Sequence, residues 1–197
     1  MANARTPQAR YALVVLLPRV IEAQIEDAFL SLVGITRPIM GFHITLVGPF
    51  QWLHATPQHA LDRLARLCRH TRPFEVTVAG LGAFVSEESS AVYLRVAPNR
   101  ALCRLQARAL RLLRPHILLQ QDASAEDYVP HVTLGLGLTP EERDRALASM
   151  ADERFGAIFT VTEVHLVKEE LSSPWRPIMT FPLAGQPLDD AQRIHER

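Results

Sequence analysis

Apolar and polar residues along the chain alternate between short apolar runs and longer amphipathic segments. Short runs rich in β-branched residues are typical of strands, whereas apolar residues recurring with the helical period are typical of helices. The continuous apolar run at 11–17 predicts a strand that is covered on both faces. In chain order, the pattern predicts strands at 11–17, 39–50, 74–84, 91–97, 131–137, 155–167 and 175–183, and helices at about 20–33, 57–70, 98–115 and from 139 onward.

Residues that start or stop regular structure support these boundaries. Pro18 ends the first strand, and Gly34 lies near the end of the first helix. Gly48 and Pro49 are expected to close the second strand, and the polar turn SEESS to join the next two strands as a hairpin. Three helices open on a capping residue or a proline, as is usual at helix N-termini: Thr56-Pro57, Pro98-Asn99 and Thr139-Pro140.

The order of elements is repeated in the two halves of the chain. FHITLVGPF is followed by a Thr-Pro helix and FEVTV, and PHVTLGLGL is followed by a Thr-Pro helix and FTVTEV. His43 and His131 are 88 positions apart, and Phe74 and Phe159 are 85 positions apart. This near-constant spacing indicates an internal duplication.

The duplication predicts an α+β fold made of one bilobal domain over residues 10–183. We expect two pseudo-symmetric antiparallel sheets that flank a central cleft, with helices packed outside and the related strands facing each other across the cleft. Residues 184–197 are polar and are expected to form a mobile tail.

Composition narrows the function classes. The 197 residues carry 21 basic and 21 acidic side chains, and 48% of them are hydrophobic, which is typical of an ordinary globular protein. A chain of this length buries roughly 70% of its unfolded surface, so it should fold without disulfides or metal ions. Zero net charge argues against an extended nucleic-acid platform, which needs a basic excess.

The chain ends and the cysteines indicate a soluble cytoplasmic protein that does not bind membranes. Met1–Arg10 lacks the apolar core of a signal peptide, and no apolar stretch reaches the roughly 18 residues of a membrane span. Cys68 and Cys103 lie in segments of helical periodicity and belong to no C-x-x-C motif, so we expect buried free thiols. We also expect the protein to act as a monomer.

Two short motifs carry candidate chemistry. His43-Ile-Thr45-Leu and His131-Val-Thr133-Leu share the pattern His-x-Thr-Leu. On a strand, residues i and i+2 face the same side and lie roughly 6.5–7 Å apart, so each histidine shares a face with its threonine. If the duplication brings the two strands together, two imidazoles and two hydroxyls converge on one site.

Such a site suits displacement at phosphorus. One imidazole can accept a proton from the attacking oxygen while the other protonates the departing oxygen, since the unperturbed pKa of histidine is about 6.5. The hydroxyls can donate hydrogen bonds to the non-bridging phosphate oxygens. The arrangement requires neither a metal nor a cofactor.

The paired His-x-Thr-Leu motifs, their spacing and the duplicated element order resemble the two-histidine (2H) phosphoesterase superfamily, in particular its 2′-5′ RNA ligase-like branch. The resemblance covers residues 10–183 and implies a bilobal fold and metal-independent hydrolysis of a cyclic phosphodiester. It further implies that His43 is the general acid, that His131 is the base that activates water, and that Thr45 and Thr133 hold the phosphate. The substrate would be a small 2′,3′-cyclic nucleotide or an RNA terminus, which places the protein in RNA processing.

One position departs from this pattern. The RNA cyclic phosphodiesterases that the chain resembles often have a basic residue after the second His-x-Thr-Leu-Gly, whereas Leu136 follows Gly135 here. This departure favours one alternative to hydrolysis, a non-catalytic module that binds a phosphorylated ligand or RNA. Two others also stay open: 2′-5′ joining of RNA ends, which uses the same groups in reverse, and a purely structural two-lobed protein.

Further residues are weaker candidates for substrate contacts. Tyr128 precedes the second motif, and Trp175 and Arg176 begin the last strand, so these three are predicted to contact substrate. Lys168 and Arg95 are candidate phosphate neighbours by strand position. Further aromatic residues that could stack on a base are Tyr11, Phe42 and Phe50, but Phe42 is expected to point away from the cleft. The remaining histidines show no ligand spacing and are interpreted as packing or surface residues: His54, His59, His70, His116, His165 and His195. The arginines of the 98–115 helix are interpreted as its solvated face: Arg104, Arg108, Arg111 and Arg114.

Overall fold

The computed structural model describes residues 9–29, 37–54, 57–85, 89–120, 125–151, 155–170 and 173–186. The helices are α1 (Arg19–Phe29), α2 (Gln58–His70), α3 (Arg100–Leu113) and α4 (Pro140–Ser149), with a 3₁₀ turn at Arg114–His116. The strands are β1 (Arg10–Leu16), β2 (His43–Trp52), β3 (Phe74–Val85), β4 (Ser90–Val96), β5 (Ile117–Leu119), β6 (His131–Leu138), β7 (Gly156–Val161), β8 (Glu163–Glu170) and β9 (Ser173–Pro182).

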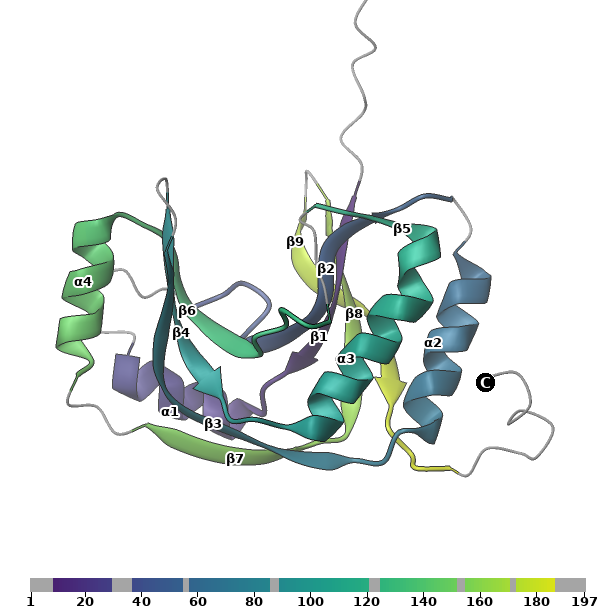
Figure 1. Ribbon diagram of the computed structural model, residues 1–197, viewed down its shortest axis with the longest axis horizontal. Helices are drawn as coiled ribbons and strands as arrows, with labels where there is room; N and C mark the ends of the chain where they lie inside the picture. Colours follow the sequence, from purple (N-terminus) through teal and green to yellow (C-terminus); the bar gives the residue numbers. More distant parts are fainter. Residues whose placement is uncertain are drawn as a thin grey trace, which may run out of the picture.

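The strands of the described residues form one antiparallel sheet in the order β7-β3-β4-β6-β2-β1-β8-β9, with β5 added beside β2. Figure 1 shows this sheet curled into a half-barrel, with α4 outside one wall and α2 and α3 outside the other. The fold is therefore α+β with external helices, as the sequence predicts.

The two halves of the sheet meet between the strands that carry the His-x-Thr motifs. β2 and β6 pair antiparallel through a single residue pair, Ile44 and Val132. The expectation of two separate sheets, with related strands on opposite walls, is thus corrected. The motif strands are neighbours at the centre of one continuous sheet, because this pairing joins the two halves.

From the centre of the sheet outward, β2 and β1 are followed by β8, whereas β6 and β4 are followed by β3. β3 and β8 therefore each lie in the half of the sheet opposite to the motif strand that precedes them in the chain. The strand at the place equivalent to β3 is therefore β8, not the FTVTEV segment that the sequence matches to it. That segment spans the end of β7 and the start of β8, and β7 pairs directly with β3.

The core lies between the convex face of the sheet and the helices. Ile44, Val132 and Leu94 are fully buried on this face, and Ile25 of α1 and Leu64 of α2 belong to the same apolar cluster. Strands alternate their side chains, so the neighbouring residues of β2, β4 and β6 face the concave side. The concave side therefore carries the motif histidines and threonines.

Helix boundaries follow the capping signals. The Asn99 side chain accepts hydrogen bonds from the backbone of Ala101 and Leu102, and Thr139 and Glu142 form a reciprocal capping box. α2 begins at Gln58, one residue after Pro57, and Thr56 lies outside the described residues. Gly34, the predicted end of the first helix, also lies outside them, as do residues 187–197 of the predicted tail.

Two strand predictions are wrong in extent. β2 continues past Gly48 and Pro49 to Trp52, and its register against β1 shifts between Val47 and Phe50, at the kind of irregular position where a strand tolerates proline. The predicted strand 155–167 is two strands that separate at Thr162, since the chain there leaves β3 and joins β1. The apolar alternation runs through this change of partner and gives no sign of it.

Both cysteines were expected to be buried, and this prediction is wrong for Cys103. Cys68 is buried, and burial raises the pKa of its thiol to about 12, whereas Cys103 is exposed on α3. The arginine face of α3 is as predicted, with Arg104, Arg111 and Arg114 exposed. No helix among the described residues is long and apolar enough to cross a membrane.

Candidate active site

The paired motifs meet on the concave face at the centre of the sheet. Ile44 lies opposite Val132, and facing residues of an antiparallel pair step in opposite directions. This register sets His43 across from Thr133 and Thr45 across from His131. All four side chains are half-buried. The sequence-predicted cradle of two imidazoles and two hydroxyls is therefore assembled by neighbouring strands.

Each imidazole is fixed by the same backbone contact. His43 Nδ1 lies 3.0 Å from the carbonyl oxygen of Gly41, and His131 Nδ1 lies 2.8 Å from that of Val129. Because a carbonyl only accepts, each Nδ1 carries the proton and donates it. Nε2 of each ring is then left available to exchange a proton in the cleft.

Burial sets the charge of the pair. It lowers the pKa of both His43 and His131, while the hydrogen bonds to Gly41 and Val129 act in the opposite direction. The neighbouring charge of His131 also lowers the pKa of His43. Both rings therefore favour the neutral form at neutral pH, and an anion bound between them would favour their protonation.

Helix α1 supports the segment that leads into His43. The Glu22 carboxylate is buried and accepts a hydrogen bond of 2.9 Å from the backbone N–H of Phe42. A Cβ on Gly41, whose φ is +89°, would collide with this carboxylate. Arg37 contacts the same carboxylate at 3.5 Å. Glu22 thus holds the turn whose carbonyl orients the His43 ring.

Tyr128 ties the two motifs together. Its hydroxyl donates a hydrogen bond of 3.0 Å to the backbone carbonyl of Thr45, from the loop that enters β6. Burial raises the pKa of this hydroxyl well above its usual range, so it stays protonated. The structure brings Tyr128 to the site, with its hydroxyl on the backbone of the first motif.

Two aromatic residues that the sequence did not single out lie against His131. The ring centroids of Phe84 and Tyr93 are 4.9 and 5.1 Å from that of His131, and 4.4 Å from each other. Both residues come from the β3–β4 hairpin. The alternation within that hairpin shows that they share a face, but only the pairing of β4 with β6 places that face beside the second motif.

The basic candidates separate onto the two faces of the sheet. Arg95 of β4 lies directly opposite His131 and is exposed on the concave face. Lys168 lies over the Tyr11 ring at 5.8 Å, on the convex side, and Arg176 is its cross-strand partner. The structure brings Arg95 to the site, and it does not bring Lys168 or Arg176 there.

Trp175 lies on the concave face, in the half of the sheet that contains His43. It packs against a small apolar cluster of Ala12, Val14 and Val167, and the guanidinium of Arg10 lies 5.7 Å from the centre of its ring. The cleft therefore has an aromatic side chain in each half. Arg10 is a further residue that no sequence pattern singled out, since only the pairing of β1 with β8 brings it near Trp175.

The other aromatic candidates, and the other histidines among the described residues, do not reach the motifs, while His195 lies outside those residues. Phe42 and Phe50 are fully buried, which agrees with the expectation for Phe42. Tyr11 stacks against Phe50 on the convex side. His165 is buried and lies 3.2 Å from Thr180 and from Glu163, consistent with a packing role.

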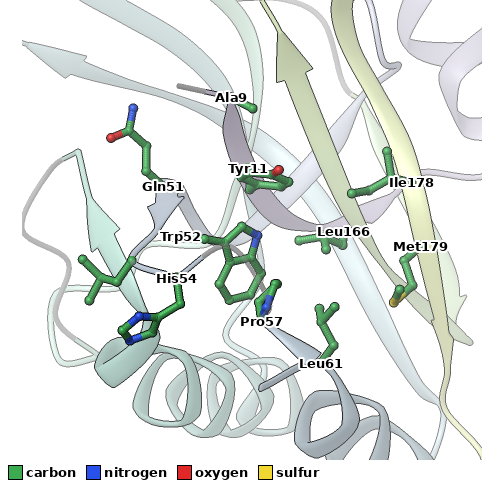
Figure 2. Close-up of a pocket in the computed structure, with 11 residues that line it drawn as sticks. Ala9, Tyr11, Gln51, Trp52, His54, Pro57, Leu61, Leu166, Ile178 and Met179 are labelled. Carbon is green, nitrogen blue, oxygen red and sulfur yellow. The ribbon is translucent and has the colours of Figure 1, made fainter. Parts of the chain in front are cut away.

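A separate cavity of about 420 Å³ lies on the convex side, between α2 and the ends of β1, β2, β8 and β9 (Figure 2). Trp52, Tyr11 and Leu166 line it with Leu61 of α2, and its polar lining includes His54 and Gln51. It contains no residue of either His-x-Thr motif. Within the described parts of the chain, no three His, Cys, Asp or Glu side chains cluster as a metal site would require.

Two curated proteins match most of the chain in sequence. One is a protein of Geobacillus sp. (strain WCH70) whose name describes it provisionally as a phosphoesterase. It is 26% identical to this chain over 144 residues, which are 73% of this chain and 79% of the relative. A Bacillus anthracis protein (strain CDC 684 / NRRL 3495) with the same kind of name is 25% identical over 141 residues, 72% of this chain and 78% of its own length.

Two crystal structures share the fold. The protein TT0787 of Thermus thermophilus has a TM-score of 0.65 at 20% identity, over 90% of this chain and 100% of its own. E. coli LigT complexed with 3′-AMP has a TM-score of 0.63 at 20% identity, over 90% of this chain and 99% of its own. The sequence profile of the 2′-5′ RNA ligase superfamily matches residues 37–172, which include both motifs, and the chain belongs to that superfamily.

Proposed function

We propose that the protein is a metal-independent phosphoesterase that hydrolyses a cyclic phosphodiester, the 2′,3′-cyclic phosphate of a small nucleotide or of an RNA end. One observation carries this proposal. Two histidines, each fixed through Nδ1 to a backbone carbonyl, lie with two threonines on one face of adjacent strands. Two oriented imidazoles are what in-line displacement at phosphorus needs.

The roles of the four residues are those that the resemblance to the superfamily implies. Nε2 of neutral His131 removes a proton from water, whose oxygen forms a bond to phosphorus. The bond from phosphorus to the ribose oxygen breaks, and protonated His43 gives its proton to that oxygen. The product is a phosphomonoester with a free ribose hydroxyl. Thr45 and Thr133 donate hydrogen bonds to the non-bridging oxygens, each worth about 3 kcal/mol at most.

Two features of the surroundings support a phosphate ligand. The phosphate anion would raise the lowered pKa of His43 and so supply the protonated acid. Arg95, opposite His131, offers a guanidinium on the same face, although Leu136 occupies the position where a basic residue often follows the second motif. The E. coli relative has been crystallised with 3′-AMP, which is consistent with a nucleotide ligand.

The test uses purified protein with nucleoside 2′,3′-cyclic phosphates and cyclic-ended oligonucleotides, and identifies the product by phosphorus NMR. We expect hydrolysis that chelators do not inhibit, with a bell-shaped pH profile. His43→Ala and His131→Ala should each lower kcat by about 10²- to 10⁴-fold. Near-normal turnover in either variant would contradict the paired acid–base roles.

Two outcomes would favour the alternatives. Linear RNA ends that become joined by a 2′-5′ bond would show the reverse reaction at the same groups. Tight nucleotide binding without turnover over long incubation would indicate a binding module.

A further inference from the structure

Phe84 is an unusual residue for the inside of a cleft. It lies on the concave face near the end of β3, and the residue is 39% exposed. Its ring nevertheless contacts His131 almost perpendicularly, with an angle of 77° between the two planes. A large apolar ring is thus kept at the surface beside a proposed catalytic imidazole.

The ring is supported from below by Tyr93. The two rings are 4.4 Å apart and tilted by 30°, so Tyr93 covers one face of Phe84. Tyr93 is only 8% exposed and lies over Gly82, where any Cβ would come within 2.6 Å of the tyrosine ring. Gly82 therefore makes the space that this stack occupies, and the burial of Tyr93 holds the stack in place.

The exposed face of Phe84 continues an apolar surface. Ala91 is the cross-strand partner of Phe84, and Leu136 is the next partner along the same row. Leu136 is 78% exposed, and Ala91 between them is small. The row forms a low apolar floor on the concave face, beside the partly exposed ring of Phe84.

The two halves of the site differ in the side chains that flank the motif residues. In the His43 half, Val14 is the cross-strand partner of Thr45, and His165 is the next partner along the same row. In the His131 half, Tyr93 takes the place of Val14 opposite Thr133, and Gly82 takes the place of His165. The four motif residues are therefore arranged symmetrically, but their aromatic neighbours differ. The Tyr93–Phe84 stack contacts His131, whereas Trp175 in the other half packs against the cluster that contains Val14. The stack thus distinguishes the His131 end of the site from the His43 end.

We propose that the outer face of Phe84 stacks on the nucleobase of the nucleotide that carries the scissile phosphate. This inference rests on the proposed function and adds the residue that recognises the base of the substrate. The base continues the Tyr93–Phe84 stack, and the ribose spans from there to the phosphate beside His131. Stacking of a base on an aromatic side chain strengthens binding by about 5- to 150-fold.

The kinetic test compares a nucleoside 2′,3′-cyclic phosphate with ribose 2,3-cyclic phosphate, which has the same scissile group but no base. The wild type should prefer the nucleoside through a lower KM. Phe84→Leu should lose most of that preference, because kcat/KM should fall further for the nucleoside than for the base-free substrate. Phe84→Trp should retain the preference. Ile158→Ala, which truncates an exposed strand residue far along the same half, is the matched control.

A binding measurement keeps the inference testable if neither substrate is turned over. Calorimetry with a nucleoside 3′-monophosphate and with ribose 3-phosphate should show the same base preference in the wild type and its loss in Phe84→Leu. An unchanged base preference in Phe84→Leu would overturn the inference. An equal loss on both ligands would also overturn it, because Phe84 would then act on His131 and not on the base.

Discussion

At the scale of single residues, the site is defined by how its groups are held. Both histidines donate Nδ1–H to the carbonyl of the residue two positions earlier, so each motif orients its own imidazole. The two histidines differ in the strand residue that faces them: Leu16 lies opposite His43, whereas Arg95 lies opposite His131. A cation beside one histidine thus distinguishes the two ends of an otherwise symmetric site.

Arg95 should therefore contribute to substrate affinity. Replacing it with Gln removes a charge-assisted hydrogen bond to an anionic substrate, which is worth about 1.5–3 kcal/mol, or roughly a 10- to 150-fold rise in KM. Steady-state kinetics on a cyclic nucleotide would measure this rise. Lys168→Gln is the control, since Lys168 lies on the convex side. Equal effects of the two substitutions would contradict a specific role for Arg95.

The buried histidines also predict how stability depends on pH. Burial lowers the pKa of His43 and His131 in the folded state, while histidine in the unfolded chain titrates at about 6.5. Protons therefore bind more readily to the unfolded state below this pH. Urea unfolding should give a constant free energy above about pH 7.5 and a falling one below about pH 6.5.

The double variant His43→Gln/His131→Gln provides the comparison. It should lose part of the acid-dependent fall, with the remainder due in part to His165, whose pKa burial also lowers. Parallel pH curves for the wild type and the double variant would show that these two imidazoles are not responsible.

At the scale of elements, much of the fold could be predicted from the sequence and part of it could not. Most strand and helix positions follow from periodicity and capping residues such as Asn99 and Thr139. The division at Thr162 could not be predicted, because it depends on which strand each side pairs with and not on local pattern. Partner choice is equally why Phe84 and Tyr93 were missed.

Helix α1 provides an example of support that no motif reveals. Glu22 looks like any surface residue of an amphipathic helix, yet its carboxylate is buried against the Gly41 turn. Glu22→Ala leaves the Phe42 N–H without its acceptor, which costs about 1–3 kcal/mol. We expect a lower midpoint in urea and a lower kcat, because the His43 ring loses its fixed carbonyl.

The control for this prediction is Asp27→Ala, which removes an exposed carboxylate from the same helix. Its midpoint and kcat should match those of the wild type. Wild-type kcat in Glu22→Ala, despite lower stability, would show that Glu22 supports the fold alone.

At the scale of the whole molecule, the site lies where the sheet is least continuous. A single residue pair joins β2 to β6, and the Tyr128 hydroxyl adds a contact from the loop before β6 to Thr45. The duplication in the sequence predicted that the motifs would meet. It could not predict that they meet as neighbours, because that depends on the pairing of β2 with β6 and not on local pattern.

Tyr128→Phe tests the importance of this contact. It removes the hydrogen bond that links the loop before β6 to β2, at a cost of about 0.5–1.5 kcal/mol in unfolding free energy. We expect kcat to fall with little change in KM, because the two motifs lose a tether but keep their substrate contacts. Chemical denaturation and steady-state kinetics would measure both. A change confined to KM would instead indicate direct contact with substrate.

The exchange of β3 and β8 between the halves has a consequence for how such a site can arise. A half-chain with only one motif would place its last strand outside its own sheet, so it could not complete a fold alone. Two copies of such a half would complete each other by swapping that strand, as a two-fold symmetric dimer. Both histidines would then come from one ancestral residue, and fusion of the two genes would free Arg95 and Phe84 to differ from their counterparts.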